Sequence, residues 1–300
     1  MVKLKKYLPI YIMLAPGFIY LLINNYIPMA GMVIAFKNVD FSLGILKSPF
    51  AGLANFEYLF RTPDAFRITR NTILYNFSFI IVNLVMGVFF AILLSEIRRN
   101  IYKKVYQTVI LLPYMISIVI VSYLSYAFLS TDTGVINKIL IGLGMEKVSW
   151  YNSPAYWPAI LIMVNCWKNV GYGTVIYLAS ILGIDRSLYE AASVDGISKL
   201  KEIFHITIPM IKPTIITIVL LNVGRIFYSD FGLFYQIPMN SGALLDVTNT
   251  IDTYVYRGLI TLGDIGMSSA AGVYQSIVGF ILILLANWLT RKYSNENALF

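Results

Sequence analysis

Six long apolar runs constrain the fold of this chain more than any other feature of its sequence. A transmembrane α-helix needs about 20 consecutive, mostly apolar residues to cross the hydrocarbon core of a bilayer. Runs of about that length lie near 7–30, 71–95, 107–129, 156–182, 213–235 and 269–289. The chain is 58% hydrophobic and 13% charged, whereas soluble domains are about 45–50% apolar and about 25% charged. The sequence therefore predicts an all-α integral membrane protein, a single domain over 1–300 with six transmembrane helices surrounded by membrane lipid.

The first run follows Lys3, Lys5 and Lys6, as the apolar core of a signal peptide would. It is longer than such a core, and no small-residue cleavage site follows it. Both features distinguish a retained helix from a removed signal. We therefore expect the first run to be a transmembrane helix.

Lysine and arginine are distributed unevenly over the segments between the runs. If the N-terminus is cytoplasmic, the inner segments carry 13 cations and six acids, whereas the outer segments carry eight of each. Cations accumulate on the cytoplasmic side of membrane proteins. Orientation thus explains the net charge of +8, and no basic stripe indicates nucleic acid as a partner. We expect both termini and the segment 185–212 to be cytoplasmic.

Several classes of chemistry have no support in this sequence. One cysteine, Cys166, and one histidine, His205, exclude a disulfide framework within the chain and a metal site rich in these residues. The phosphate-binding pattern G-x-x-x-x-G-K-S/T is absent. Asp230 is the only carboxylate within a run, which argues against general acid–base catalysis in the membrane. We expect no metal, no cofactor and no catalytic residue in this chain.

Polar side chains inside the runs are candidates for a substrate cavity, because such groups are costly in a bilayer and tend to mark pathways. The candidates are Asn165, Trp167, Lys168, Asn169, Tyr172, Asn222, Arg225, Tyr126 and Gln275. Four of those in the run 156–182 stand at i, i+3, i+4 and i+7, on one helix face. Amides bond hydroxyl groups and aromatic rings stack on sugar rings, so this set suits a sugar.

Each candidate also has a structural alternative. Asparagine between helices is often a packing contact, and tyrosine and tryptophan near span ends often form an interfacial belt. Lys168 and Arg225 can instead bond neighbouring carbonyls or Asp230. The sequence leaves these alternatives open.

The segment 185–212 is the longest polar interval on the predicted inner side. Its Glu190–Ala192 stretch favours helix. Gly196 fits the position just past a helix end, where positive φ is needed. Pro209 and Pro213 are expected to mark the start of the next span. An ordinary amphipathic inner loop is the alternative interpretation.

This segment resembles the EAA motif of permease subunits in binding-protein-dependent ABC importers. It reads Glu-Ala-Ala, three residues, Gly, nine residues, Ile-x-Ile-Pro, with Ile208 in place of the usual Leu. The stretch Gly52-Leu53-x-Asn55-Phe56 looks like an outer segment of carbohydrate permeases. The stretches 251–258, 270–276 and 286–287 resemble the polysaccharide and complex-oligosaccharide branch. The resemblance covers essentially the whole chain.

The resemblance implies the type I ABC importer permease fold, with a cytoplasmic coupling helix, in a bacterial plasma membrane. It implies import of an oligosaccharide or related sugar by alternating access. The implied partners are a second homologous permease, two ATPase subunits that hold ATP and Mg, and an extracytoplasmic solute-binding protein. The residues that the resemblance assigns to ATPase coupling are Glu190, Ala191, Ala192, Asp195, Gly196 and Pro209.

Two readings from other classes compete with the importer permease. A secondary carrier or channel would show inverted repeats with broken helices at matching positions, and the sequence shows no convincing repeat. A membrane-embedded enzyme would need a catalytic set that the runs lack.

Overall fold

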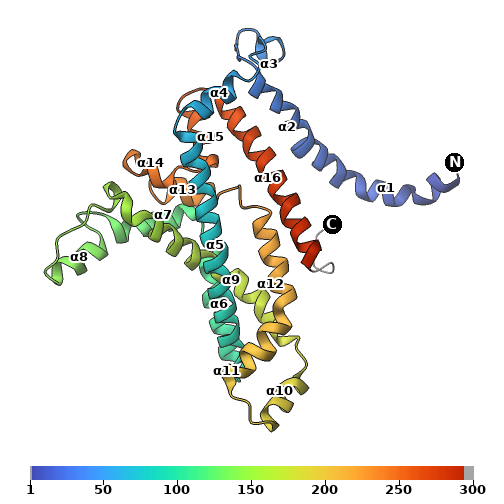
Figure 1. Ribbon diagram of the computed structural model, residues 1–300, viewed down its shortest axis with the longest axis vertical. Helices are drawn as coiled ribbons and strands as arrows, with labels where there is room; N and C mark the ends of the chain where they lie inside the picture. Colours follow the sequence, from blue (N-terminus) through green and yellow to red (C-terminus); the bar gives the residue numbers. More distant parts are fainter. Residues whose placement is uncertain (1, 294–300) are drawn as a thin grey trace. The chain divides into compact units, whose positions relative to one another are not determined.

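The computed structural model describes residues 2–293, which are mostly helical (Figure 1). The long helices are α1 (Val2–Leu21), α5 (Asp64–Ser95), α6 (Asn100–Met115), α7 (Ile118–Leu129), α9 (Trp157–Leu182), α12 (Ile208–Val223) and α16 (Ile265–Tyr293). The shorter ones are α2 (Ile27–Met29), α3 (Gly44–Lys47), α4 (Ala54–Arg61), α8 (Val135–Gly142), α10 (Arg186–Val194), α11 (Lys199–Glu202), α13 (Phe231–Gln236), α14 (Leu245–Thr248) and α15 (Ile251–Ile260). The one β-bridge among the described residues joins Lys37 and Phe50. Glu296, counted above among the inner acids, lies outside the described residues.

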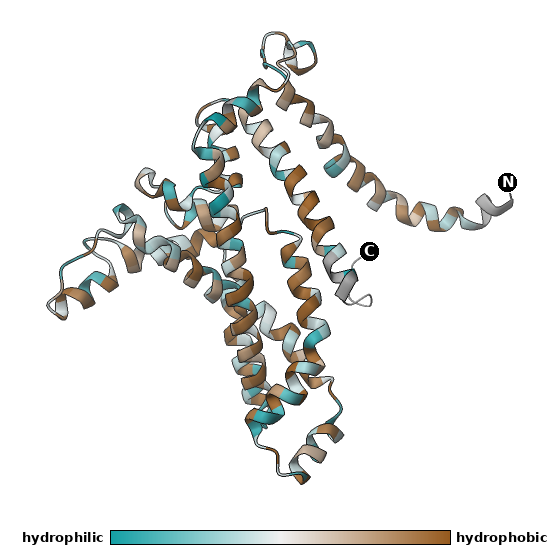
Figure 2. Ribbon diagram, in the orientation of Figure 1, coloured by the Kyte–Doolittle hydropathy of each residue, from teal (hydrophilic) through white to brown (hydrophobic). Residues whose placement is uncertain are grey.

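Four helical stretches are long and apolar enough to cross a membrane. They are Tyr7–Phe36, Asp64–Ser95, Lys199–Val223 and Ile265–Trp288. The bent pair of α6 and α7 provides a fifth. Helix α9 matches the predicted run 156–182 almost residue for residue but is not among these stretches, because polar residues such as Asn165, Lys168 and Asn169 interrupt its apolar sequence. Figure 2 shows the apolar character along α5, α12 and α16.

The predicted third span, 107–129, is wrong as a single straight helix. The chain forms α6 and α7 instead, with a bend of 95° between them. Pro113 lies in the last turn of α6 and cannot donate a backbone hydrogen bond there. Ile116 and Ser117 then adopt extended ψ angles of 134° and 139°.

The predicted fifth span, 213–235, is wrong at both ends. The helix begins at Lys199, runs through Pro209 and Pro213, and ends at Val223. A π-helical turn at Ile203–Thr207 ends two residues before Pro209, and such a local widening accommodates a proline that lacks the N–H group. Beyond Val223 the chain leaves the helix over 224–230 and then starts α13.

Two other helices are longer than the runs that predicted them. Helix α5 begins at Asp64, seven residues before the predicted run 71–95. Helix α16 covers Ile265–Tyr293 and so extends past both ends of 269–289. Apolarity alone predicts the membrane-embedded part of a helix, and polar residues continue these two beyond it.

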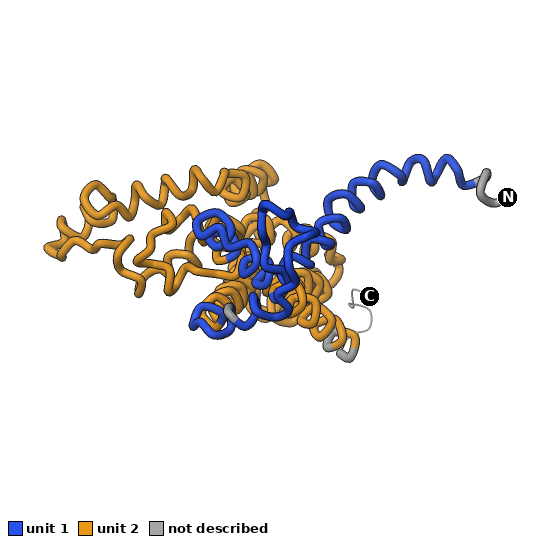
Figure 3. Tube along the Cα trace, turned by 90° about the horizontal axis from the view of Figure 1, so that it is seen from above, with its two compact units in different colours: residues 1–65, 255–274 blue, residues 66–254, 275–300 orange. Residues whose placement is uncertain are grey.

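Contacts divide the chain into two compact units, which Figure 3 shows in different colours. Unit 1 comprises 1–65 and 255–274, and unit 2 comprises 66–254 and 275–300. In unit 1, the Asn55 side chain in α4 donates hydrogen bonds to the carbonyls of Ala35 (2.9 Å) and Lys37 (3.0 Å). These bonds tie α4 to the segment that precedes it in unit 1.

Two apolar clusters lie among the described residues of unit 2. One surrounds Trp157 of α9 and includes Phe79 of α5 and Phe234 of α13. The other surrounds Tyr177 of α9 and includes Ala91 of α5 and, from α12, Ile211. Helix α9 is therefore the element around which α5, α12 and α13 pack.

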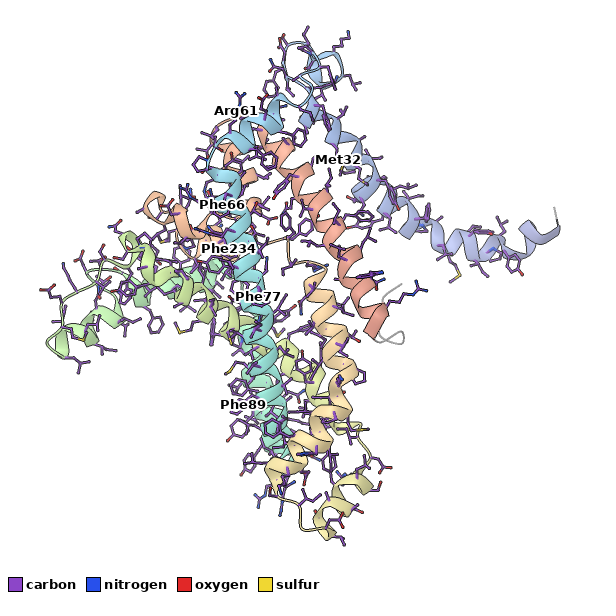
Figure 4. The ribbon with its side chains drawn as sticks, in the orientation of Figure 1. Met32, Arg61, Phe66, Phe77, Phe89 and Phe234 are labelled. Atoms are coloured by element: carbon purple, nitrogen blue, oxygen red, sulfur yellow. The ribbon has the colours of Figure 1, made fainter. Side chains whose placement is uncertain are left out.

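The exposed side of α5 carries large apolar side chains. Phe77 and Phe89 project from this helix (Figure 4) and are 54% and 50% exposed. Lipid or another subunit covers surface of this kind in a membrane protein.

Helices α6 and α9 approach each other at Gly171. A Cβ atom on Gly171 would lie 2.2 Å from the carbonyl oxygen of Ile110, a backbone atom of α6. Small residues permit such close approach between membrane helices. The two backbones are thus in direct contact at this point.

Candidate functional site

A cavity of about 620 Å³ lies within unit 2, between α5, α6, α9 and the end of α12. Its polar lining is mostly amide and phenol groups. The amides are those of Asn76, Asn83, Asn165, Asn169 and Asn222, and the phenols those of Tyr114, Tyr172, Tyr177 and Tyr228. The charged lining residues are Arg225 and Asp230. Such a surface can form many hydrogen bonds with a neutral or weakly charged polar ligand.

The broken end of α12 forms one side of this cavity. Asn76 of α5 donates through its side-chain nitrogen to the carbonyls of Ile226 (2.9 Å) and Tyr228 (3.0 Å). Asn76 lies about 18 Å from the start of α5 and about 29 Å from its end, at 1.5 Å per residue. The non-helical segment 224–230 is therefore at membrane depth, where such backbone is tolerated only if it is buried in protein or lines a water-filled cavity.

Five of the nine predicted cavity residues line this cavity: Asn165, Asn169, Tyr172, Asn222 and Arg225. Asn165 is buried and accepts a hydrogen bond of 2.9 Å from the Asn83 side chain. The Tyr172 ring stacks on Tyr114, with the ring centres 5.2 Å apart and an angle of 18° between the planes. The helical spacing in α9 thus brings an amide group and an aromatic surface to the same space.

Lys168 has a different position. Its amine donates to the backbone carbonyls of Ile116 (2.6 Å), Tyr114 (3.2 Å) and Pro113 (3.5 Å). These carbonyls lie at the bend between α6 and α7, where the regular helical hydrogen bonding is interrupted. The structure confirms the alternative in which Lys168 bonds neighbouring carbonyls, and the bend is held from α9.

The other three predicted cavity residues are not among those that line the cavity. The Gln275 side chain is buried and donates to the Phe227 carbonyl (2.8 Å) and to the Asp252 carboxylate (3.0 Å). Tyr126 of α7 lies against Tyr151, with the ring centres 5.6 Å apart. Trp167 of α9 is 44% exposed.

The predicted run 213–235 includes Arg225, Ser229 and Asp230. They lie beyond the end of α12 because the helix stops at Val223. Asp230 is the N-cap of α13 and accepts from the Leu233 amide at 3.1 Å. Ser229 donates to Asp252 through both its amide and its hydroxyl, each at 2.7 Å.

Sequence reasoning missed Asn76 and Asn83, two cavity residues on α5. They are seven residues apart in an otherwise apolar run, which places them on one helix face. That spacing was the available signal. Tyr114 and Tyr228 were missed as well, and no spacing distinguishes them from interfacial aromatic residues.

The second candidate region is α10, in the segment between α9 and α11. Asp185 caps its N-terminus and accepts from the Ser187 amide at 2.9 Å. That backbone N–H, and then the Ser187 side chain, hold the pKa of the Asp185 carboxyl below its usual range. Residues 186–194 therefore form a well-capped helix.

The C-terminus of α10 confirms the local structure predicted from Gly196. This glycine has φ of +69°. Its amide donates to the Ser193 carbonyl (3.2 Å), and the Ile197 amide donates to the Ala192 carbonyl (3.0 Å). The two bonds define the Schellman motif, which closes a helix through a residue with positive φ.

The other predicted coupling residues differ in their surroundings. Glu190, Ala191 and Asp195 are exposed, whereas Ala192 is buried against the protein. Pro209 is exposed on α12, outside the short helix. The structure thus separates Pro209 from the rest of the predicted set.

Glu190 lies at the edge of a second cavity of about 540 Å³, between α10, α11 and the α5–α6 connection. It has no ion pair within the described part of the chain. Lys199 bonds Glu202 at 2.8 Å and lies 3.5 Å from Glu96. Val194, Leu200 and Phe204 are 87%, 70% and 64% exposed. The segment thus presents an unpaired carboxylate beside exposed apolar side chains.

Comparisons with known proteins identify the family. Residues 68–295 match the binding-protein-dependent transport system inner membrane component family. Protein LplB of Bacillus subtilis (strain 168) is 36% identical over 296 residues, 99% of this chain and 92% of that protein. The polygalacturonan/rhamnogalacturonan transport system permease protein YteP of the same organism has the same identity and coverage.

A solved structure gives the same answer for the fold. One chain of a bacterial ABC transporter involved in the import of the acidic polysaccharide alginate superposes with a TM-score of 0.88. It is 32% identical, and the match covers 97% of this chain and 98% of that one. The predicted all-α type I importer fold and the resemblance are thereby confirmed. The chain belongs to the binding-protein-dependent transport system inner membrane components and is a membrane-spanning permease subunit of a bacterial ABC transporter, not an enzyme.

Proposed function

We propose that this permease carries an oligosaccharide or related sugar from an extracytoplasmic binding protein into the cytoplasm. The cavity supports this proposal most directly, since amides can bond sugar hydroxyls and the Tyr114–Tyr172 pair offers an aromatic surface. Its volume of about 620 Å³ is within the range of about 300–1,000 Å³ for ligand sites. The name of one relative points the same way, since YteP is a polygalacturonan/rhamnogalacturonan transport system permease protein.

The coupling segment supports an ATP-driven mechanism. In this proposal, α10 docks in a cleft on a separate ATPase subunit that holds ATP and Mg, and Glu190 pairs with a basic residue there. The exposed Glu190 carboxylate and the exposed Val194 and Leu200 side chains provide the polar and apolar parts of such a contact. A second ATPase and a second, homologous permease complete the transporter. Closure of the ATPases then moves the α10 segments and switches the cavity between the two sides of the membrane.

Substitution of cavity amides tests the transport site. Asn169→Ala and Asn222→Ala should each lower oligosaccharide uptake about fivefold, because each removes about one hydrogen bond to the sugar. Uptake is measured in vesicles that contain the whole transporter and internal ATP, with its binding protein outside, against a panel of neutral and acidic oligosaccharides.

Asn152→Ala is the matched control, since this side chain bonds only the exposed Ser149 hydroxyl outside the cavity. It should transport at the wild-type rate. Unchanged uptake in both cavity variants would contradict the transport site. If the wild-type transporter takes up none of the oligosaccharides in the panel, the proposed cargo is wrong.

Orientation in the membrane has its own test. We propose cytoplasmic termini and a cytoplasmic α10, as the distribution of lysine and arginine indicates. In a Cys166→Ser background, Lys199→Cys should react with an impermeant thiol reagent only in inside-out vesicles. Leu46→Cys, in a predicted outer segment, should react only in right-side-out vesicles. The Lys199 side chain is 66% exposed and Leu46 is 87% exposed, so both positions are accessible to the reagent, and the reverse labelling pattern would overturn the topology.

A further inference from the structure

The segment between α12 and α13 places one cation, Arg225, at the cavity between α5, α6, α9 and the end of α12. Arg225 is exposed and lines this cavity. Among the residues that the structure describes, its guanidinium has no hydrogen-bond or ion-pair partner. Its backbone position is fixed, because Asn76 holds the carbonyls of Ile226 and Tyr228 on either side of Phe227.

The other charged side chains near the cavity have hydrogen-bond partners. Asp230 also lines it, and its carboxylate accepts from the Leu233 amide at the start of α13. Asp230 and Arg225 form no ion pair. Lys168 donates to three backbone carbonyls at the bend between α6 and α7. The guanidinium is thus the one cation among the lining residues, and it has no hydrogen-bond or ion-pair partner in the described part of the chain.

An unpaired guanidinium at membrane depth carries a cost in free energy, so charged groups there usually face a cavity and mark a substrate pathway. The guanidinium is planar and can bond both oxygens of a carboxylate in parallel. A neutral sugar would leave the charge of Arg225 without a counter-ion, whereas a sugar acid would supply one. The surrounding amides remain available for the hydroxyl groups.

Building on the proposed function, we propose that Arg225 selects for a carboxylate on the cargo, so that the permease prefers uronate-containing oligosaccharides over their neutral counterparts. The guanidinium binds a uronate carboxylate when the cargo occupies the cavity. Arg225 is then a specificity-determining residue of the transport site.

The test compares trigalacturonate with its methyl ester, which has the same sugar skeleton without the charges. Uptake of each is measured in vesicles with the whole transporter, internal ATP and the cognate binding protein outside. The readout is the ratio of acid to ester uptake, in wild type and variant with the same binding protein, so the contribution of that protein cancels. Arg225→Gln should lower this ratio about tenfold, as expected for the loss of a charge-assisted hydrogen bond.

Two further variants control for charge and for assembly. Arg225→Lys keeps the charge but loses the parallel bonding geometry, so the ratio should fall between those of wild type and Arg225→Gln. Lys147→Gln removes an exposed cation that pairs with Asp132 away from the cavity, and the ratio should stay at the wild-type value.

The following results would overturn the inference. An unchanged ratio in Arg225→Gln, or wild-type preference for the ester, shows that Arg225 does not read a carboxylate. If the wild type imports neutral oligosaccharides from the panel but not trigalacturonate, the inference fails and the proposed function stands. If it imports none of the panel, both fail.

Discussion

Glu190→Ala is expected to abolish nearly all ATP-driven uptake while the transporter still assembles. The side chain is exposed and has no ion pair within the described residues, so its loss removes no internal contact. If the carboxylate is buried against a basic residue of the ATPase, truncation leaves that residue unpaired and costs about 2–5 kcal/mol. The loss of uptake should therefore be at least about 30-fold. Uptake and ATP hydrolysis measured in the same vesicles should separate, with hydrolysis retained.

A matched pair at Gly196 tests whether the geometry of this segment matters as well as its charge. Gly196 has φ of +69°, and no atom lies within 4 Å of a Cβ built there, so a substitution changes the backbone energy without a clash. Gly196→Asn should couple normally because asparagine tolerates this conformation, whereas Gly196→Val should be strained by about 1–2 kcal/mol and couple poorly. Normal coupling in Glu190→Ala, or equal coupling in the two Gly196 variants, would contradict the assignment of α10.

Gly171→Ala is expected to be strongly destabilising although it adds one methyl group. The new Cβ would lie 2.2 Å from the Ile110 carbonyl oxygen and 2.9 Å from the Leu111 Cα. Both are backbone atoms, so no side-chain rotation relieves the overlap and α6 must move away from α9. Overpacking of this kind costs about 3 kcal/mol. The yield of folded transporter and its unfolding temperature measure the effect.

Gly173→Ala, in the same helix, is the control. Its nearest neighbour would be the Tyr177 ring at 3.7 Å, an ordinary contact. Since alanine favours helix over glycine by about 0.5–1 kcal/mol, this variant should be as stable as the wild type or slightly more so. Equal stability of the two variants would contradict the close approach of α6 and α9.

Local signals predicted much of this molecule. Apolar runs located the helices because a bilayer imposes their length and composition, and Glu190–Gly196 predicted a short helix with a glycine stop because those preferences are local. The bend after Met115 could not be predicted from its own residues. Pro113 weakens the turn, but the freed carbonyls are satisfied by Lys168, which is more than 50 residues away.

The candidate cavity shows the same limit. Asn169, Lys168 and Gln275 are all polar residues in apolar runs, and spacing treats them alike. In the fold, Asn169 faces the cavity, whereas the other two satisfy backbone carbonyls of other segments. Which polar groups are left for a ligand depends on these distant carbonyls. The position at which α12 ends, Val223, also depends on a distant residue, because Asn76 of α5 stabilises the segment beyond it.

The attachment of the segment 224–230 to α5 gives the helix Lys199–Val223 one fixed end. This helix is about 37 Å long, starts just beyond α10 and carries Asn222 at its far end. Asn76 of α5 anchors the residues that follow, and the Arg225 amide donates to the Asn222 carbonyl at 3.0 Å. In the proposed transport cycle, a displacement at α10 would therefore turn the helix about its far end, and Asn222 and Arg225 would stay together beside this pivot.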